Sequence, residues 1–178
     1  MHTNFKSRLY LAFRIIFLSS LLLMSQFCFA SFDLTLPITI QSDHLEYNHQ
    51  NGTVTHTGQV VVKQADKLLK ADSLVVYNTP SPRPTLSKMV AKGTAKQLAT
   101  FQGTLSPKQP PIEGRALTIS YFPKTQKLLL EGNAFLKKEQ DTFSSPSIQF
   151  DLASSIVTAT KDQHNRPTLV IYKNDTKK

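Results

Sequence analysis

PITIQSDHLEYNHQNGTVTHTGQVVVKQADKLLKADSLVVY, residues 37–77, is the stretch that decides the fold. Apolar and polar residues alternate along it in short runs, as in Ile38-Thr39-Ile40, and a period of two is typical of half-buried β-strands. Asn51-Gly52 predicts a two-residue type I′ turn, because both central residues of that turn need positive φ. The stretch lacks the i, i+3, i+4 spacing of an amphipathic helix. It therefore predicts short antiparallel strands.

Weaker copies of this pattern continue to the end of the chain. Gly58, Gly93 and Gly132 each precede a short strand, at intervals of 35 and 39 residues. A glycine at the same place in each unit predicts a sharp corner or bulge where the sheet folds over. Proline-rich segments at 78–84 and 102–111 predict loops. The repeats predict an all-β antiparallel domain, and a sandwich, a jelly roll and a stacked solenoid all stay open at this point.

The first 30 residues have the features of a targeting signal. Lys6, Arg8 and Arg14 precede an apolar run at 15–24, and small residues end at Ala30. This order is typical of a secretory signal peptide, here cleaved near Ala30. The apolar run is shorter than the roughly 20 residues that span a bilayer. An uncleaved N-terminal anchor is the alternative interpretation.

We therefore expect a signal peptide at 1–30, a β-domain at 31–173 and a flexible tail at 174–178. The only cysteine, Cys28, lies in the signal, so the mature domain has no disulfide. Phe27 before it is too large for lipoprotein processing. Three of the nine net positive charges also belong to the signal, which leaves +6 on the exported part. That charge favours anionic partners such as membrane lipid, lipopolysaccharide phosphates or acidic polysaccharide, although solubility alone explains it equally well.

The sequence carries no recognisable catalytic constellation. The four histidines of the mature domain lack the spacing of zinc ligands. Asp43 and Asp72 stand at strand starts, where aspartate commonly makes turn hydrogen bonds. Neither a G-x-S-x-G segment nor a glycine-rich phosphate loop is present. We expect no enzyme activity, no metal and no cofactor, and we do not expect nucleic acid as a partner of an exported chain.

The ordered motifs resemble those of the OstA-like, organic-solvent-tolerance family, and within it the periplasmic lipopolysaccharide-transport bridge proteins. The first motif is a proline before I-x-I, at residues 37–40, and Ser-Asp follows at 42–43. T-G-x-V-x-V-x-Q then occurs at 57–64 and A-D-x-L-x-V at 71–76. The later segments 111–114 (PIEG) and 130–136 (LEGNAFL) resemble the family's V-E-G and L-x-G-N-A-x-L. The resemblance covers residues 37–160. It departs from the family at 144–148, where we expect Pro146 to alter the start of a strand that otherwise survives.

The resemblance implies an open, twisted β-jelly roll, a sheet folded like a V that is apolar inside and polar outside. It implies a periplasmic protein that binds lipopolysaccharide through its lipid A acyl chains and bridges the inner and outer membranes. The implied partners are an inner-membrane LptC-like component, an outer-membrane LptD-like translocon and further copies of the chain joined head to tail. The candidate edge strands for these contacts are 38–40 and 169–172.

Strand parity predicts which residues line the interior, because successive side chains of a strand point to opposite faces. The expected lining is Ile38, Ile40, Val60, Val62, Leu74, Val76, Leu117, Ile119, Tyr121, Leu128, Leu130, Ile148 and Phe150. At residues 60–62 parity decides only weakly which face is the inner one, because the side chains on both faces are apolar. The alternative is that these residues form an ordinary sealed core.

Two rival functions stay open. One is the membrane-anchored subunit of the same pathway, if the N-terminal segment is retained. The other is an envelope β-module that binds polysaccharide without transporting it, with a closed core and exposed aromatic platforms; the absence of tryptophan disfavours it. Lys63, Lys67 and Lys70 near a strand end either meet lipid phosphates or form a solvated edge.

Overall fold

A computed structural model describes residues 37–79, 84–104 and 110–171. All described residues lie in one compact unit, Thr35–Lys178. The expected signal peptide and C-terminal tail therefore lie outside the described residues. Within them the protein is built from strands and one 3-10 turn, η1 (Pro123–Thr125), so the all-β prediction is confirmed. No helix in this part of the chain is long and apolar enough to cross a membrane.

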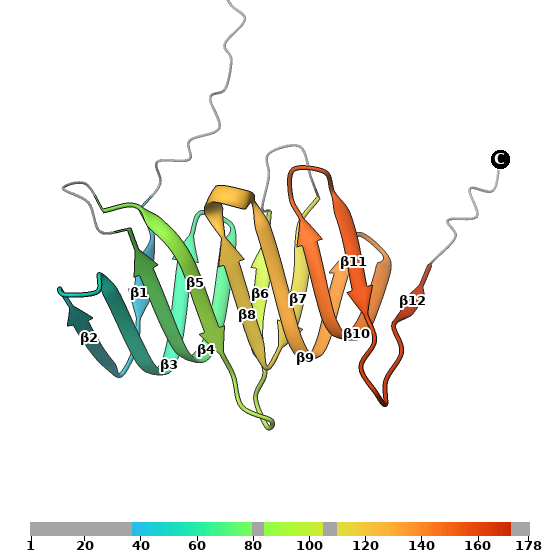
Figure 1. The fold of residues 1–178 in the computed structure, drawn as a ribbon, viewed down its shortest axis with the longest axis horizontal. Coiled ribbons are helices and arrows are strands. Elements are labelled where there is room, and N and C mark those ends of the chain that lie inside the picture. The colour runs from blue at the N-terminus through green and yellow to red at the C-terminus, as the bar shows by residue number, and fades with distance from the viewer. Residues whose placement is uncertain (1–36, 80–83, 105–109, 172–178) are drawn as a thin grey trace, which may run out of the picture. The chain divides into compact units, whose positions relative to one another are not determined.

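The strands of the described residues all join one antiparallel sheet. In chain order they are β1 (Thr39–Gln41), β2 (His44–Asn48), β3 (Thr53–Gln64), β4 (Lys67–Asn78), β5 (Leu86–Lys92), β6 (Ala99–Gly103), β7 (Ile112–Ala116), β8 (Thr118–Phe122), β9 (Lys127–Lys138), β10 (Asp141–Asp151), β11 (Ile156–Thr160) and β12 (Thr168–Val170). Figure 1 shows them side by side, with β2 near one end of the row and β11 and β12 at the other.

The sheet folds into two layers because β3, β4, β9 and β10 are long and pair with different neighbours along their two halves. Layer A consists of β2, β5, β8, β11 and the adjoining halves of the long strands, 53–57, 73–78, 127–131 and 147–151. Layer B consists of β1, β6, β7, β12 and the other halves, 60–64, 67–71, 135–138 and 141–145. The fold therefore has one corner along which the two layers meet.

The corner is built on residues with positive φ. Gly58 and Gln59 have φ of 76° and 45° in β3, and Gly132 and Asn133 have φ of 78° and 51° in β9. The pairing of β3 with β4 shifts register at the first of these sites. Glycine tolerates such φ without strain, so the predicted glycine corners are confirmed at Gly58 and Gly132. Gly93 instead follows the end of β5.

Pro146 lies inside β10, at a register shift between Ser145 and Ser147, rather than at the start of the strand. A proline has no N–H to donate to a ladder, so a bulge in the strand accommodates it. The expected strand survives, but the predicted position of Pro146 within it was wrong.

The type I′ turn predicted at Asn51-Gly52 was also wrong. β2 ends at Asn48 and β3 begins at Thr53, which leaves a four-residue loop, and only Gly52 has positive φ, at 66°. The Asn48 side chain accepts hydrogen bonds from the N–H groups of Gln50 and Asn51, at 3.0 and 3.3 Å. This side-chain bonding stabilises the longer turn.

Candidate functional site

The register of the strands places the inward side chains of layer A in two rows that run parallel to the corner. The row nearer the corner is Leu45, His56, Leu74, Ala91, Ile119, Leu130, Ile148 and Ala159. The row farther from it is Tyr47, Val54, Val76, Met89, Tyr121, Leu128, Phe150 and Val157. Apart from the His56 imidazole and the hydroxyls of Tyr47 and Tyr121, the side chains of these rows are apolar.

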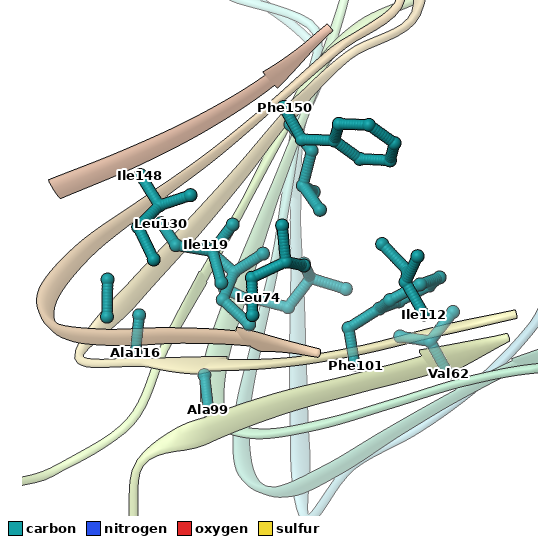
Figure 2. Packing of buried hydrophobic residues seen from close by; sticks show 14 of the residues in the cluster. Val62, Leu74, Ala99, Phe101, Ile112, Ala116, Ile119, Leu130, Ile148 and Phe150 are labelled. Carbon is teal, nitrogen blue, oxygen red and sulfur yellow. The ribbon is translucent and has the colours of Figure 1, made fainter. Parts of the chain in front are cut away.

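Layer B presents a matching inner face. Its row nearer the corner consists of short side chains, Val60, Ala71, Ala99, Ala116, Ala134 and Ser145. Its farther row is Ile40, Val62, Leu69, Phe101, Gly114, Leu136, Phe143 and Leu169. Figure 2 shows Ala99 and Ala116 close to the corner, whereas Phe101 and Ile112 of layer B and Phe150 of layer A lie where the layers diverge. In layer B, the larger side chains therefore lie where the layers diverge.

Burial along these rows changes from the middle of the sheet to its ends. Leu130 and Phe150 in the middle are 0% exposed. At the N-terminal end Leu45 is 57% exposed and Tyr47 is 47% exposed, and at the C-terminal end Leu169 is 51% exposed. The inner rows thus continue into exposed apolar surface at both ends, and His56 in layer A and Ser145 in layer B are buried polar side chains within them.

A lysine covers part of the open side of the interior beside β10. Lys138, at the end of β9 in layer B, places its Nζ 5.7 Å from the centroid of the Phe150 ring in layer A. An ammonium over an aromatic face is weakly attracted to it, and the methylenes of the lysine cover apolar surface. Tyr121 lies partly buried in the same farther row, and this burial raises the pKa of its phenol.

His56 is a polar group inside the row of layer A nearer the corner. It is 4% exposed, and its Nδ1 lies 3.0 Å from Ser42 Oγ, which also donates to the His44 carbonyl. Burial lowers the pKa of His56, because the charged imidazolium loses more hydration than the neutral ring. The interior at this end therefore favours a neutral histidine.

The structure places eleven of the thirteen predicted lining residues in the inner rows. These are Ile40, Val60, Val62, Leu74, Val76, Ile119, Tyr121, Leu128, Leu130, Ile148 and Phe150. Ile38 precedes β1 and is 46% exposed. Leu117 lies at the corner between β7 and β8, where its side chain packs over Gly132. The chain turns at Leu117, so the alternation restarts after it and parity wrongly put this residue inside. Contact of the other eleven residues with lipid stays a prediction.

Sequence reasoning missed several inner-face residues, among them Leu45, Tyr47, Met89, Phe101 and Phe143. Leu45 and Tyr47 alternate in the quoted stretch, so their spacing was a usable signal. Met89 and Phe101 flank a connection between two layers, and the change of layer hides their common orientation. These residues belong to the same interior as the predicted set.

Many charged residues lie outside the interior. Lys63 and Lys70 are exposed, and Lys67 Nζ lies 3.9 Å from Asp66 Oδ1. The described residues contain no group of three or more histidine, cysteine, aspartate or glutamate side chains that would hold a metal ion. The chemistry of the site is thus a large apolar interior beneath polar outer faces.

Comparison with known proteins identifies the architecture. The family model described as "LptA/(LptD N-terminal domain) LPS transport protein" matches residues 39–156. The chain belongs to this family. It is 30% identical over 162 residues to the lipopolysaccharide export system protein LptA of Escherichia coli K12, covering 90% of this chain and 85% of that protein. This is a family of transport proteins and not of enzymes, as the sequence indicates.

Two further relatives agree with this assignment. LptA of Haemophilus influenzae is 28% identical, covering 89% of this chain and 90% of that protein. The crystal structure of LptH, the LptA-homologous periplasmic component of the lipopolysaccharide transport device of Pseudomonas aeruginosa, superimposes with a TM-score of 0.66. It covers 78% of this chain and 96% of that chain, at 23% sequence identity. The fold of the two proteins is therefore the same.

Proposed function

We propose that the chain is a periplasmic carrier that holds the acyl chains of lipopolysaccharide between its two layers. In this role it bridges the inner and outer membranes, so that the lipid is exported and assembled in the outer membrane. The observation that carries the proposal is the set of apolar inner rows, which run through the sheet and end in exposed apolar side chains at both ends. The names of the relatives as lipopolysaccharide export proteins support it.

The physical need for such a carrier follows from the hydrophobic effect. Transfer of each methylene out of water is favourable by about 0.8 kcal/mol of free energy, so exposing one acyl chain of about a dozen carbons to water costs roughly 10 kcal/mol. Lipid A carries several chains. A protein that covers them throughout the crossing removes this barrier, and a continuous apolar face is the surface that does so without specific contacts.

The inner rows suggest where acyl chains enter. Val76, Met89 and Tyr121 in the farther row of layer A are only partly buried, so apolar surface is accessible beside the packed middle. Phe150 is fully buried beneath Lys138. We infer that the acyl chains first contact the partly buried residues and that the layers part over Phe150 to admit them.

The two ends are the expected docking surfaces for partners. β1 and β2 form the N-terminal end and would pair with an inner-membrane LptC-like component, and β11 and β12 form the C-terminal end and would pair with an outer-membrane LptD-like translocon. The same two ends allow head-to-tail self-association, an open contact that does not close into a ring. Tyr172, part of the proposed C-terminal edge, lies outside the described residues.

The fate of the N-terminal segment separates this proposal from the anchored subunit of the pathway. We expect cleavage near Ala30 and a protein without its signal in the periplasm. Intact mass of the protein released from the periplasm measures this directly. A mass that includes the first 30 residues, together with membrane retention, would favour the anchored subunit.

Photo-crosslinking in cells that make lipopolysaccharide tests the carrier. The crosslinking residue replaces Val76 or Tyr121 on the inner face and, as matched controls, Tyr77 or Thr39 on the outer faces. These inner positions are partly buried, so a larger side chain is tolerated better there than at fully buried Leu74. We expect lipopolysaccharide adducts at the inner positions and not at the controls. Adducts at neither set would indicate a sealed core and favour the polysaccharide-binding module.

A further inference from the structure

The outer face of layer B carries a second concave surface, on the side of the sheet opposite to the apolar interior. It is a shallow cavity of about 260 Å³. Its lining includes the outward side chains of Lys70, Thr100, Gln102, Glu113, Arg115 and Phe135, from β4, β6, β7 and β9. We call this surface the outer-face site. Four adjacent strands build it, so its geometry is fixed by the sheet.

One cross-strand row forms the floor of the outer-face site. Lys70 pairs with Thr100, Thr100 with Arg115, and Arg115 with Phe135. The Arg115 guanidinium lies 4.2 Å from the centroid of the Phe135 ring. Contact with an aromatic face orients the guanidinium while its N–H groups remain available to donate hydrogen bonds. The orientation of the Arg115 guanidinium thus favours binding of an anion through its oxygen atoms.

Neither cation of this site forms an ion pair with a described residue. Within the described residues no carboxylate lies within 4.0 Å of the charged nitrogens of Lys70 or Arg115. Glu113, which also lines the cavity, lies 3.8 Å from Lys137 Nζ. Arg115 lies over an aromatic ring, and Lys70 lies two strands away with the Thr100 hydroxyl between the two cations. This arrangement favours an anionic ligand that has an apolar face and many hydroxyl groups.

We propose that the outer-face site binds an acidic sugar, bearing phosphate or carboxylate, of the lipid that the interior carries. This proposal rests on the proposed function, since it assumes that the acyl chains enter between the layers. The saccharide of such a lipid must then leave at the open edge of the sheet. A larger cavity of about 680 Å³ at that edge of layer B includes Ile112 and shares Gln102 and Glu113 with the outer-face site. The larger cavity is also lined by Lys137 and by the carboxylates of Asp66 and Glu139. In this proposal the saccharide crosses the edge of layer B, where the two cavities adjoin, to reach Arg115.

The test compares two ligands with the full mature protein: lipopolysaccharide saccharide from which the acyl chains have been removed, and lipid A without core sugars. The site variant is Lys70→Gln with Arg115→Gln. The control variant, Lys92→Gln with Lys124→Gln, removes the same charge from exposed residues outside the site. We expect the site variant to bind the deacylated saccharide about tenfold more weakly than wild type, which corresponds to about 1.4 kcal/mol. The control variant and the affinity for lipid A should change less than twofold.

A second variant separates the shape of the site from its charge. Phe135→Ala removes the ring beneath Arg115 and keeps every charge. It should also weaken binding of the deacylated saccharide, and thermal unfolding of each variant checks that the fold is intact. Equal losses in the site and control variants would show general charge attraction and overturn the site. An unchanged affinity in Phe135→Ala would overturn it as well.

The two proposals fail separately in this experiment. Wild type that binds lipid A but not the deacylated saccharide would overturn the outer-face site and leave the carrier standing. Wild type that binds the deacylated saccharide in a way that depends on Arg115, but does not bind lipid A, would support the site and overturn the carrier. Higher salt should remove the difference between the site variant and wild type, because exposed ion pairs are screened.

Discussion

The middle of the sheet and its two ends use the same kinds of residue with opposite results. Ile148 and Leu45 both belong to the row of layer A nearer the corner, yet Ile148 is 0% exposed and Leu45 is 57% exposed. Ile148 has a neighbouring strand on each side, whereas Leu45 lies on β2, which pairs only with β3. Burial here depends on how many neighbours a strand has. The middle stabilises the fold, and the ends hold apolar surface that another molecule can cover.

The largest expected effect of this difference is on stability. Leu130→Ala removes a fully buried side chain from the middle, so we expect the free energy of unfolding to fall by about 2–5 kcal/mol. Leu45→Ala removes an exposed one, so we expect a fall below about 0.5 kcal/mol. Urea denaturation measures both through the midpoint at unchanged slope. Equal losses in the two variants would contradict the comparison and show that the end is packed in solution.

The second expected effect is on association between copies of the chain. Leu45→Asp places a charge on the N-terminal end and Leu169→Asp places one on the C-terminal end, both on the inner faces. An unpaired charge in an interface costs about 2–5 kcal/mol, so each variant alone should self-associate at least tenfold more weakly than wild type. Thr158→Asp, on the exposed outer side of β11, is the matched control.

A mixture of these two variants sharpens the test. Head-to-tail contact joins the C-terminal end of one copy to the N-terminal end of the next. The intact C-terminal end of Leu45→Asp and the intact N-terminal end of Leu169→Asp should therefore form dimers that grow no further. Sedimentation velocity distinguishes dimers from longer chains. A mixture that stays monomeric would argue against head-to-tail contact through these ends.

The sequence predicted the interior best where a strand is regular over several residues. Leu74 and Val76 in β4 and Leu128 and Leu130 in β9 alternate without a break, and the structure places all four in the inner rows. Leu117 failed because the chain turns there between layers, and a turn resets the alternation. Local periodicity contains no information on where a strand changes layer.

Properties that depend on neighbouring strands could not be predicted from the sequence. The exposure of Leu45 follows from the position of β2 beside a single strand, which is a matter of topology. The outer-face site combines Arg115 and Phe135 with Lys70, from strands far apart in the chain. The loop after Asn48 shows a third limit, because an asparagine side chain stabilised a longer turn than the Asn51-Gly52 pair predicts.

The smallest expected effect concerns His56, the buried histidine in the inner rows of layer A. Burial lowers the pKa of His56 in the folded protein below its ordinary 6.5, so the unfolded chain binds more protons as the pH falls. The contribution of His56 to stability is therefore complete above pH 6.5 and decreases as the pH falls towards its folded pKa. Urea denaturation at pH 7.5 and pH 5.0 should show a lower midpoint at pH 5.0, with a loss smaller than that of Leu130→Ala.

Replacement of the histidine identifies the source of this pH dependence. His56→Gln keeps a polar partner for Ser42 but does not titrate, so it should reduce the difference between the two pH values. His164→Gln, which replaces an exposed histidine outside the interior, is the matched control. The Asp66, Asp151 and Asp162 carboxyls have pKa values held below 3.8 by hydrogen bonds, so they stay ionised between pH 5.0 and 7.5. An equal pH dependence in wild type and His56→Gln would mean that protonation at this end does not destabilise the interior.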